Sequence, residues 1–419
     1  MEKLIVTGGN TLRGRVRISG AKNAALAVLC ASIMSKNKVT LENIPDISDV
    51  RVMLEIIRCL GNIVTWENSE TVVITPSNQI GCEAPYDLVR KLRASNLLLG
   101  PVLARFGQAQ IALPGGCNIG LRPMDLHFKG LTGLGADLGM SHEFVSGRVP
   151  GKLTGARVYL DFPSVGATEN IMMAATLAEG QTLIENSAKE PEIVDLANFL
   201  NTIGARVRGA GTDVIKIDGV PSLESGGRYS VIPDRIEAGT YLVAAAATGG
   251  DVTLENLIPT HLEPLCAKLR EANVNVIEGE DSLRVTCDKG ELSPIDIKTM
   301  PYPGFPTDMQ SQLMAMLSVV PGTSVIVENI FENRFMVAHE LKRMGARIKL
   351  EGRTAVIEGV ESLRGAEVNA TDLRSGAALI IAGLVAKGDT EIANPVYIDR
   401  GYHNLEKKLN ALGALIWRK

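Results

Sequence analysis

Apolar and polar residues follow a pattern that repeats six times along the chain. Each repeat has a segment rich in Ala, Leu, Ile and Met, an alternating strand, and a charged segment with a periodic apolar stripe. Segments that are apolar on every face predict buried helices, and striped segments predict outer, amphipathic helices. The expected buried helices are residues 23–33, 95–104, 169–178, 238–247, 309–319 and 375–386.

Two markers recur in step with these helices and strengthen the case for six copies of one unit. The first marker ends the alternating strand, and it is Asn in five repeats and Pro in one: Asn43, Pro114, Asn186, Asn256, Asn329 and Asn394. The second marker is a turn residue after the amphipathic helix: Gly61, Gly135, Gly204, Asn273, Gly345 and Gly413. The pattern predicts sheets wrapped around buried helices, which is an α/β fold.

The last repeat lacks a strand pair, and a similar segment opens the chain. Residues 5–17 resemble residues 356–368 in sequence. If the units close in rings, residues 1–21 complete a C-terminal ring. We therefore predict two domains of three repeats each, one formed by residues 22–231 and the other by residues 1–21 plus 232–419. A single six-unit solenoid is the alternative, and it would leave the first strands without a partner unit.

Composition narrows the class of function. The chain of 419 residues has a net charge of −4, which argues against the broad basic surface of a nucleic-acid-binding protein. No apolar stretch approaches the ~20 residues of a membrane span, and residues 1–4 do not open a signal peptide. The six cysteines form no C-x-x-C pair and no metal-ligand spacing appears, so we expect no metal or cofactor and a cytoplasmic protein with reduced thiols. Cys30 and Cys59 lie in apolar runs and are expected in the core.

Charged residues gather at two equivalent points of the repeats. One is the start of the buried helix, and the other is the loop after the marked strand. Helix N-termini attract anions, and parallel helices in a ring would bring several of them together. A cleft between two such domains would be lined by Lys22, Arg93, Arg122, Arg334, Arg374 and Arg400. Such a cleft suits a phosphorylated or carboxylated ligand.

Each of these residues also has an ordinary structural interpretation. Arg334 could pair with Glu332, and Arg400 with Asp399, as surface ion pairs. Asp308 could be an early helix residue, and Asp372 and Arg374 could pair locally. Each ordinary interpretation is plausible by itself. Because all of these charged residues fall at the same two positions of the repeats, it is less plausible that every one of them is ordinary. The loop at residues 113–123 is the most unusual, because it combines glycines and prolines with Cys117 and Arg122.

At this point the sequence resembles a known family, the UDP-N-acetylglucosamine enolpyruvyl transferases, over essentially the whole chain. The resemblance rests on six motifs: Gly20-Ala21-Lys22-Asn23, Pro114-Gly115-Gly116-Cys117 with Gly120-x-Arg122-Pro123, Phe305-Pro306-Thr307-Asp308, Phe331-Glu332-Asn333-Arg334, Ala370-Thr371-Asp372-Leu373-Arg374 and Asp399-Arg400-Gly401-Tyr402. It implies an inside-out α/β barrel of two domains with three repeats each and an active site in the interdomain cleft. It also implies transfer of the enolpyruvyl group of phosphoenolpyruvate to the 3′-hydroxyl of UDP-N-acetylglucosamine, the first committed step of peptidoglycan synthesis.

The family's functional residues map onto this sequence as expectations. Cys117 matches the acid that protonates C3 of phosphoenolpyruvate, and Asp308 matches the base. Lys22 and Arg400 complete the expected catalytic set. The expected substrate-binding residues are Lys22, Asn23, Arg93, Arg122, Pro123, Met124, Asp125, Leu126, Ser164, Val165, Gly166, Asp308, Ile330, Arg334, Asp372, Arg374 and Arg400. Some members carry a Lys where this chain has Phe162, which leaves the diphosphate contact at that point open.

Three other functions compete with this interpretation. An enolpyruvyl transferase acting on shikimate 3-phosphate would share the repeats but would lack the cysteine loop. An RNA 3′-phosphate cyclase would need an accepting histidine and a more basic surface. A non-catalytic nucleotide-sugar sensor would show a degraded set of Cys, Asp and Arg residues, and here the set is intact.

Overall fold

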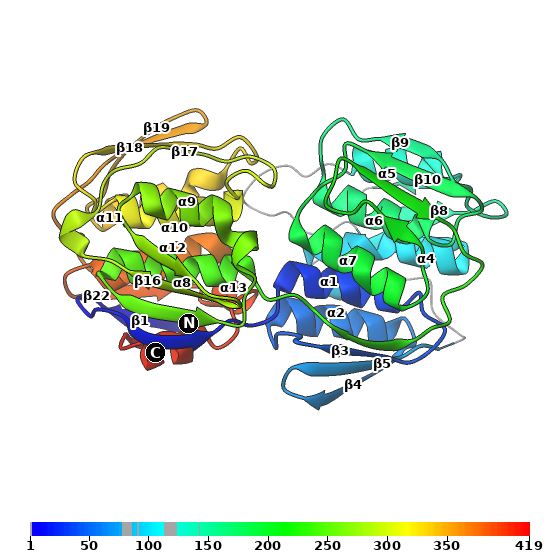
Figure 1. The fold of residues 1–419 in the computed structure, drawn as a ribbon, viewed down its shortest axis with the longest axis horizontal. Coiled ribbons are helices and arrows are strands. Elements are labelled where there is room, and N and C mark those ends of the chain that lie inside the picture. Colours follow the sequence, from blue (N-terminus) through cyan, green and yellow to red (C-terminus); the bar gives the residue numbers. More distant parts are fainter. Residues whose placement is uncertain (1, 78–85, 90–91, 113–123, 142) are drawn as a thin grey trace. The chain divides into compact units, whose positions relative to one another are not determined.

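The computed structural model describes residues 2–77, 86–89, 92–112, 124–141 and 143–419. These residues fall into two compact units, coloured along the chain in Figure 1. The N-terminal unit comprises the described residues between 20 and 232, and the C-terminal unit comprises residues 2–19 and 233–419. Among all these residues, no helix is long and apolar enough to cross a membrane.

The N-terminal unit holds three sheets around its apolar helices. Their strand orders are β13-β3-β5-β4, β6-β8-β7 and β11-β12-β10-β9. The strands are β3 (Val39–Glu42), β4 (Ile63–Asn68), β5 (Thr71–Thr75), β6 (Gln108–Ala112), β7 (Asp137–Met140), β8 (Phe144–Arg148), β9 (Arg157–Tyr159), β10 (Gln181–Glu185), β11 (Val207–Arg208), β12 (Val214–Asp218) and β13 (Gly227–Ser230). The helices are α1 (Lys22–Ser32), α2 (Ser48–Cys59), α3 (Tyr86–Val89), the 3₁₀ helix η1 (Arg93–Leu98), α4 (Leu99–Phe106), α5 (Asp125–Gly133), α6 (Val165–Ala175) and α7 (Pro191–Thr202).

The C-terminal unit repeats this plan with three four-stranded sheets. Their orders are β21-β22-β1-β23, β15-β16-β14-β2 and β17-β18-β20-β19. The strands are β1 (Lys3–Thr7), β2 (Arg13–Arg17), β14 (Asp251–Glu255), β15 (Asn275–Glu278), β16 (Ser282–Thr286), β17 (Ile297–Lys298), β18 (Thr323–Val327), β19 (Arg347–Glu351), β20 (Thr354–Glu358), β21 (Glu367–Asn369), β22 (Asp389–Ala393) and β23 (Leu415–Arg418). The helices are α8 (Arg235–Thr248), η2 (Pro259–Leu262), α9 (Glu263–Glu271), η3 (Lys289–Glu291), η4 (Thr307–Met309), α10 (Gln310–Leu317), η5 (Arg334–Met336), α11 (Val337–Arg343), α12 (Leu373–Val385), α13 (Val396–Asp399) and α14 (Leu405–Ala411).

The first two strands of the chain belong to sheets built mainly from its last third. β1 lies between β22 and β23, antiparallel to both, with Leu4 opposite Ile392 on one side and Arg418 on the other. β2 runs parallel to β14, with Val16 opposite Leu254. The segment that the sequence suggested as the missing strand pair thus supplies one strand to each of two sheets.

The segments predicted as buried helices are helical and buried. In the C-terminal unit, α8, α10 and α12 pack against one another, and almost every residue of each is buried. Two of the predicted segments begin with a 3₁₀ turn, η1 and η4, before the α-helix proper. One expectation about the core was wrong. Cys59 is exposed, because the periodicity of α2 places it one turn beyond exposed Glu55 on the outer face, whereas Cys30 is fully buried.

Most of the recurring Asn and Gly residues adopt backbone conformations with positive φ, which other residues disfavour. Asn43, Asn186, Asn256 and Asn394 have φ between 53° and 59°, the left-handed region that Asn tolerates better than most side chains. The turn markers also have positive φ, from 64° at Asn273 to 111° at Gly204. Asn329 does not have a positive φ. It lies two residues after the end of its strand, whereas the other four asparagines directly follow theirs, so its predicted equivalence to them was wrong. Val327 is opposite Lys298, the last residue of the parallel neighbour strand β17, so the residue at the next register position, opposite Thr299, is Glu328.

Candidate active site

Asp308 and two arginines form a compact charged cluster in the C-terminal unit. Asp308 lies in η4, Arg334 begins η5, and Arg374 lies in the first turn of α12. Arg334 Nη2 donates to Asp308 Oδ1 at 2.8 Å, and Arg374 Nη2 donates to Oδ2 at 3.0 Å. The side chains of the arginines are 2% and 5% exposed, and that of Asp308 is 27% exposed. One carboxylate with a path to solvent therefore faces two buried cations.

The arginines control the charge of Asp308. Burial alone would raise the pKa of its carboxyl group, but the charges and hydrogen bonds of Arg374 and Arg334 outweigh burial and hold the pKa well below its usual range. Burial likewise opposes the charge of Arg374, and Asp308 raises the pKa of that guanidinium above its usual value. Asp308 is thus ionised at neutral pH and, with both arginines bound to it, is a weak proton acceptor.

A buried polar layer holds Arg374 in place. Its Nη1 donates to the hydroxyl of Tyr402 at 3.2 Å, and that hydroxyl lies 2.9 Å from Thr240 Oγ1 on α8. Gln312 Nε2 donates to Thr240 and to the backbone carbonyl of Asp308. Tyr402 belongs to the motif Asp399-Arg400-Gly401-Tyr402, but the sequence alone indicates no role for it. Its contact with Arg374 spans 28 residues, and no local spacing could have revealed it.

The structure decides several of the alternatives left open by the sequence. Arg334 binds Asp308. Glu332 instead forms an ion pair with Arg353, with 3.5 Å between Glu332 Oε1 and Arg353 Nη2. Asp399 pairs with Arg418. Asp372 caps α12 by accepting hydrogen bonds from the backbone N–H groups of residues 374 and 375 at 2.8 and 3.1 Å. The proposed local ion pairs of Arg334 with Glu332 and of the Asp372 side chain with that of Arg374 are therefore not the ones found.

Two further predicted residues of this unit lie near the cluster in the fold. Ile330 is half-buried in the loop between β18 and η5. Arg400 follows α13, a helix that packs against α12 next to Gly376, where an added Cβ would meet Ile398 at 2.5 Å. Both therefore belong to segments that flank the residues bound to Asp308.

In the N-terminal unit, Lys22 begins α1 and forms an ion pair with a residue that the sequence did not indicate. Its Nζ lies 3.1 Å from Asp49 Oδ2 on α2, and the two side chains are 13% and 5% exposed. The neighbouring Asn23 is exposed. A cation and an amide thus stand at the start of a helix whose remaining residues are buried.

The expected nucleotide-binding segments converge around a buried histidine. Met124, Asp125 and Leu126 open α5, while Ser164 caps α6 and is followed by Val165 and Gly166. His127 lies between the two helix starts, because a Cβ on Gly166 would be 3.2 Å from its ring. Asn170 Nδ2 lies 2.9 Å from His127 Nδ1 and also donates to the Asn96 carbonyl in η1, the helix that Arg93 begins. The structure therefore gathers three predicted segments at one place.

His127 is held neutral at this junction. Burial is the main cause that lowers its pKa to about 4; the charge of Asp125 opposes this shift, and the charge of Arg93 adds to it. Phe162, at the position where the resemblance pointed to a lysine in some members, is 47% exposed close to the start of α6. Cys117, Arg122 and Pro123 lie outside the described residues, so their expected roles rest on the sequence alone.

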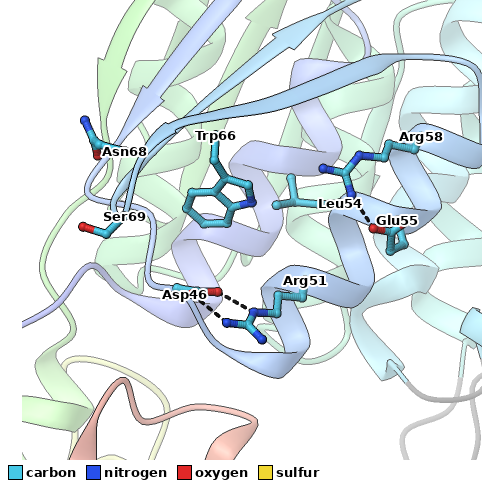
Figure 2. Close-up of a pocket in the computed structure, with 8 residues that line it drawn as sticks. All are labelled: Asp46, Arg51, Leu54, Glu55, Arg58, Trp66, Asn68 and Ser69. Carbon is cyan, nitrogen blue, oxygen red and sulfur yellow. Dashed lines mark hydrogen bonds and ion pairs between the residues drawn. The ribbon is translucent and has the colours of Figure 1, made fainter.

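A pocket elsewhere in the N-terminal unit contains none of the predicted residues. It has a volume of about 500 Å³ between α2 and the β4–β5 hairpin, and Trp66 and Leu54 are among the residues that line it (Figure 2). Its cations already have partners, because Arg51 binds Asp46 with two hydrogen bonds and Arg58 binds Glu55. Within the part of the chain that the structure describes, no group of three or more metal-ligating side chains occurs either. The Asp308 cluster and the junction at His127 remain the candidate sites.

The two-unit architecture with three sheets per unit defines the class of protein. The chain matches over its full length the structure of the enolpyruvyl transferase NikO from Streptomyces tendae, with a TM-score of 0.91, 26% identity and coverage of 99% of that chain. It also shares its fold with EPSP synthase from Acinetobacter baumannii, with a TM-score of 0.78, 21% identity and full coverage of both chains. The fold is therefore that of the enolpyruvyl transferases.

The family follows from the sequence comparison. Residues 6–409 match the family model of EPSP synthase (3-phosphoshikimate 1-carboxyvinyltransferase), and the chain belongs to this family. Two of its curated relatives carry a more specific name. UDP-N-acetylglucosamine 1-carboxyvinyltransferase 2 of Carboxydothermus hydrogenoformans is 58% identical over 419 residues, which cover all of this chain and 99% of the relative. UDP-N-acetylglucosamine 1-carboxyvinyltransferase 1 of Caldanaerobacter subterraneus is 56% identical with the same coverage.

Proposed function

We propose that this protein is an enzyme that transfers the enolpyruvyl group of phosphoenolpyruvate to the 3′-hydroxyl of UDP-N-acetylglucosamine and releases phosphate, in peptidoglycan synthesis. The observation that carries the proposal is the identity of 55–58% over the whole chain with three proteins named for this reaction. The Asp308 cluster supports it, because enolpyruvyl transfer needs a carboxylate near cations that can bind an anionic substrate.

The reaction proceeds by addition and then elimination. The 3′-oxygen bonds to C2 of phosphoenolpyruvate as C3 gains a proton, and the intermediate then loses a proton from C3 as the C2–O bond to phosphate breaks. Cys117 supplies the proton to C3, and Asp308 accepts the proton of the sugar hydroxyl. Lys22, Arg122 and Arg400 bind the anionic groups of phosphoenolpyruvate, supported by Arg93, Arg334 and Arg374.

The ion pairs of Asp308 make its strength as a base depend on substrate binding. In the ligand-free cluster the two arginines keep the carboxyl pKa too low for an effective base. An anionic substrate that draws either guanidinium toward itself removes part of that stabilisation and adds negative charge, and both effects raise the pKa of Asp308. The base becomes competent when phosphoenolpyruvate is bound, which limits unproductive proton transfer.

The nucleotide sugar binds at the junction of η1, α5 and α6 in this proposal. Residues 122–126 and 164–166 hold the uridine and the diphosphate, and Ile330 and Asp308 contact the amino sugar. The start of α6 offers backbone N–H groups to phosphate oxygens. We place the enzyme in the cytoplasm, because Cys30, Cys59, Cys266 and Cys287 are free thiols, which persist in reducing compartments.

The test is phosphate release from phosphoenolpyruvate, measured with UDP-N-acetylglucosamine and, separately, with shikimate 3-phosphate. Release with the nucleotide sugar alone is the expected result. Release with shikimate 3-phosphate alone would favour the second candidate, the activity after which the matching family model is named. An absence of release with both acceptors would contradict both proposals.

A further inference from the structure

One fully buried carboxylate outside the expected catalytic set lies between two segments of the candidate site. Glu328 follows β18 and is 0% exposed. Its Oε1 accepts hydrogen bonds from Thr299 Oγ1 at 2.9 Å and from the backbone N–H groups of Ile330 and Phe331 at 2.8 and 3.1 Å. Its Oε2 accepts from Thr307 Oγ1 at 2.9 Å. All four donors are neutral, and no ion pair of Glu328 occurs among the residues that the structure describes.

This arrangement differs from that of three other repeats that the structure describes at the same position. In three other repeats the register position just after the last pair with the parallel neighbour strand holds a left-handed Asn: Asn43, Asn186 and Asn256. Each of these asparagines donates its side-chain amide to the carbonyl across from it, at 2.7 to 2.8 Å. In this repeat Val327 pairs with Lys298, so Glu328 takes that register position and faces Thr299.

The shift by one residue changes the path of the loop. Asn329 keeps the amide bond to the Thr299 carbonyl, at 3.0 Å, but it does not adopt the left-handed conformation. The next two N–H groups then point back at the Glu328 carboxylate. A carboxylate that accepts adjacent backbone N–H groups is a strong local constraint. The loop from Ile330 onward is therefore set by Glu328 and differs from the left-handed turn at Asn43, Asn186 and Asn256.

The same carboxylate binds residues that lie close in the chain to each partner of the Asp308–Arg334 ion pair. Thr307 immediately precedes Asp308 in η4. Phe331 begins the stretch that leads to Arg334, whose guanidinium lies 5.6 Å from the Phe331 ring centre. Arg334 in turn binds Asp308. Glu328 is thus linked to Asp308 through Thr307, which precedes it in the chain, and to Arg334 through the segment that begins at Phe331.

We propose that Glu328 is a positioning residue that fixes Asp308, through Thr307, relative to the loop that carries Ile330 and leads to Arg334. The inference rests on the proposed enolpyruvyl transfer and adds to it a residue outside the reacting groups. A buried polar network of this kind costs desolvation, and full satisfaction of its members lets it specify one geometry. Small displacements of a catalytic base reduce turnover strongly, because the reacting atoms must be aligned.

The experiment compares Thr307→Val with Thr307→Ser. Valine has nearly the shape of threonine but cannot donate to Glu328, whereas serine keeps the hydroxyl. We expect Thr307→Val to lower kcat about tenfold with KM for both substrates changed less than about threefold, and Thr307→Ser to stay within about twofold of the wild type. Glu328→Gln should lower kcat about tenfold and also raise KM for UDP-N-acetylglucosamine, because the Ile330 loop loses its charged anchor.

Glu255→Gln is the matched control. Glu255 ends a strand in a neighbouring repeat of the same unit, but its side chain is 42% exposed and binds only Arg15 among the described residues. We expect wild-type kcat and KM from this variant. Melting temperatures of all variants identify any loss of folded protein, and UDP-N-acetylglucosamine affinity is measured by calorimetry alongside the kinetics.

The outcomes separate the two proposals. An active wild type with Thr307→Val and Glu328→Gln both within twofold of its kcat would overturn the positioning role alone. A Thr307→Ser variant as slow as Thr307→Val would also overturn it, since the hydroxyl would not be the cause. A well-folded wild type that does not release phosphate would instead overturn the proposed function, and the positioning role with it.

Discussion

Replacement of Asp308 by Asn should destabilise the C-terminal unit by an amount that can be worked out from its contacts. The change keeps the side-chain shape but removes the charge shared by two buried guanidinium groups. Breaking one partner of a fully buried ion pair costs roughly 3–5 kcal/mol. Asp308 is 27% exposed, so water partly solvates the unpaired arginines, and we expect a loss of about 2–3 kcal/mol.

The two tryptophans allow this loss to be measured in one unit. Trp66 belongs to β4 of the N-terminal unit, and Trp417 belongs to β23 of the C-terminal unit. In a Trp66→Phe background, urea unfolding followed by fluorescence reports on the C-terminal unit alone. Glu332→Gln is the control, because the Glu332–Arg353 pair is about half exposed and should contribute less than about 0.5 kcal/mol. A loss for Asp308→Asn no larger than that of the control would refute the reasoning.

The pH dependence of the difference in unfolding free energy between wild type and Asp308→Asn provides a second check. The folded pKa of Asp308 is depressed, so its stabilisation is fully present above the unfolded pKa of about 3.9 and is lost as pH falls toward the folded value. The difference between wild type and Asp308→Asn should therefore be constant from pH 8 to pH 5. A difference that shrinks at pH 6 would show that the arginines do not hold the carboxyl ionised.

Three further predictions concern single residues. Cys117→Ser should abolish or nearly abolish phosphate release, because a hydroxyl is a far weaker acid, whereas Cys117→Asp should keep turnover and resist a thiol-alkylating epoxide; unchanged turnover in the serine variant would rule out the thiol as the acid. Removal of Arg400 should raise KM for phosphoenolpyruvate far more than KM for the nucleotide sugar, and the reverse pattern would contradict the assignment of the anion sites. His127 should titrate near pH 4 by NMR, so that its contribution to stability, full above about pH 6.5, is lost as pH falls toward 4; a midpoint above pH 6 would contradict its burial.

The sequence predicted the repeat architecture because the physical causes are local. Helices without a polar face must be buried, and left-handed turns select Asn or Gly. Both signals are visible residue by residue, as at Asn186 and Gly204. Cys59 shows the limit of this reasoning, because an apolar neighbourhood in the sequence does not specify which face of an amphipathic helix a residue occupies.

The partners of the site residues could not be predicted, because they come from distant parts of the chain. Asp308 binds Arg374 across 66 residues, and Lys22 binds Asp49 across 27. Local spacing had suggested Glu332 as the partner of Arg334. Glu328 could not be distinguished in the sequence, because it is followed by Asn like the glutamates at the other strand ends. Only the register between β17 and β18 shows that it occupies a different position.

The position of β1 has a consequence for how the protein is made. Lys3 is opposite Ala393, and Thr7 is opposite Leu415, so this sheet unites residues separated by about the full length of the chain. Ribosomes add roughly 5–20 residues per second. The N-terminal unit can thus fold while β1 still waits, for on the order of ten to forty seconds, for its partner strands β22 and β23 to be synthesised. During that interval Leu4, Ile5 and Val6 form an unpaired apolar segment, the stretch of the nascent chain where chaperone binding would matter most.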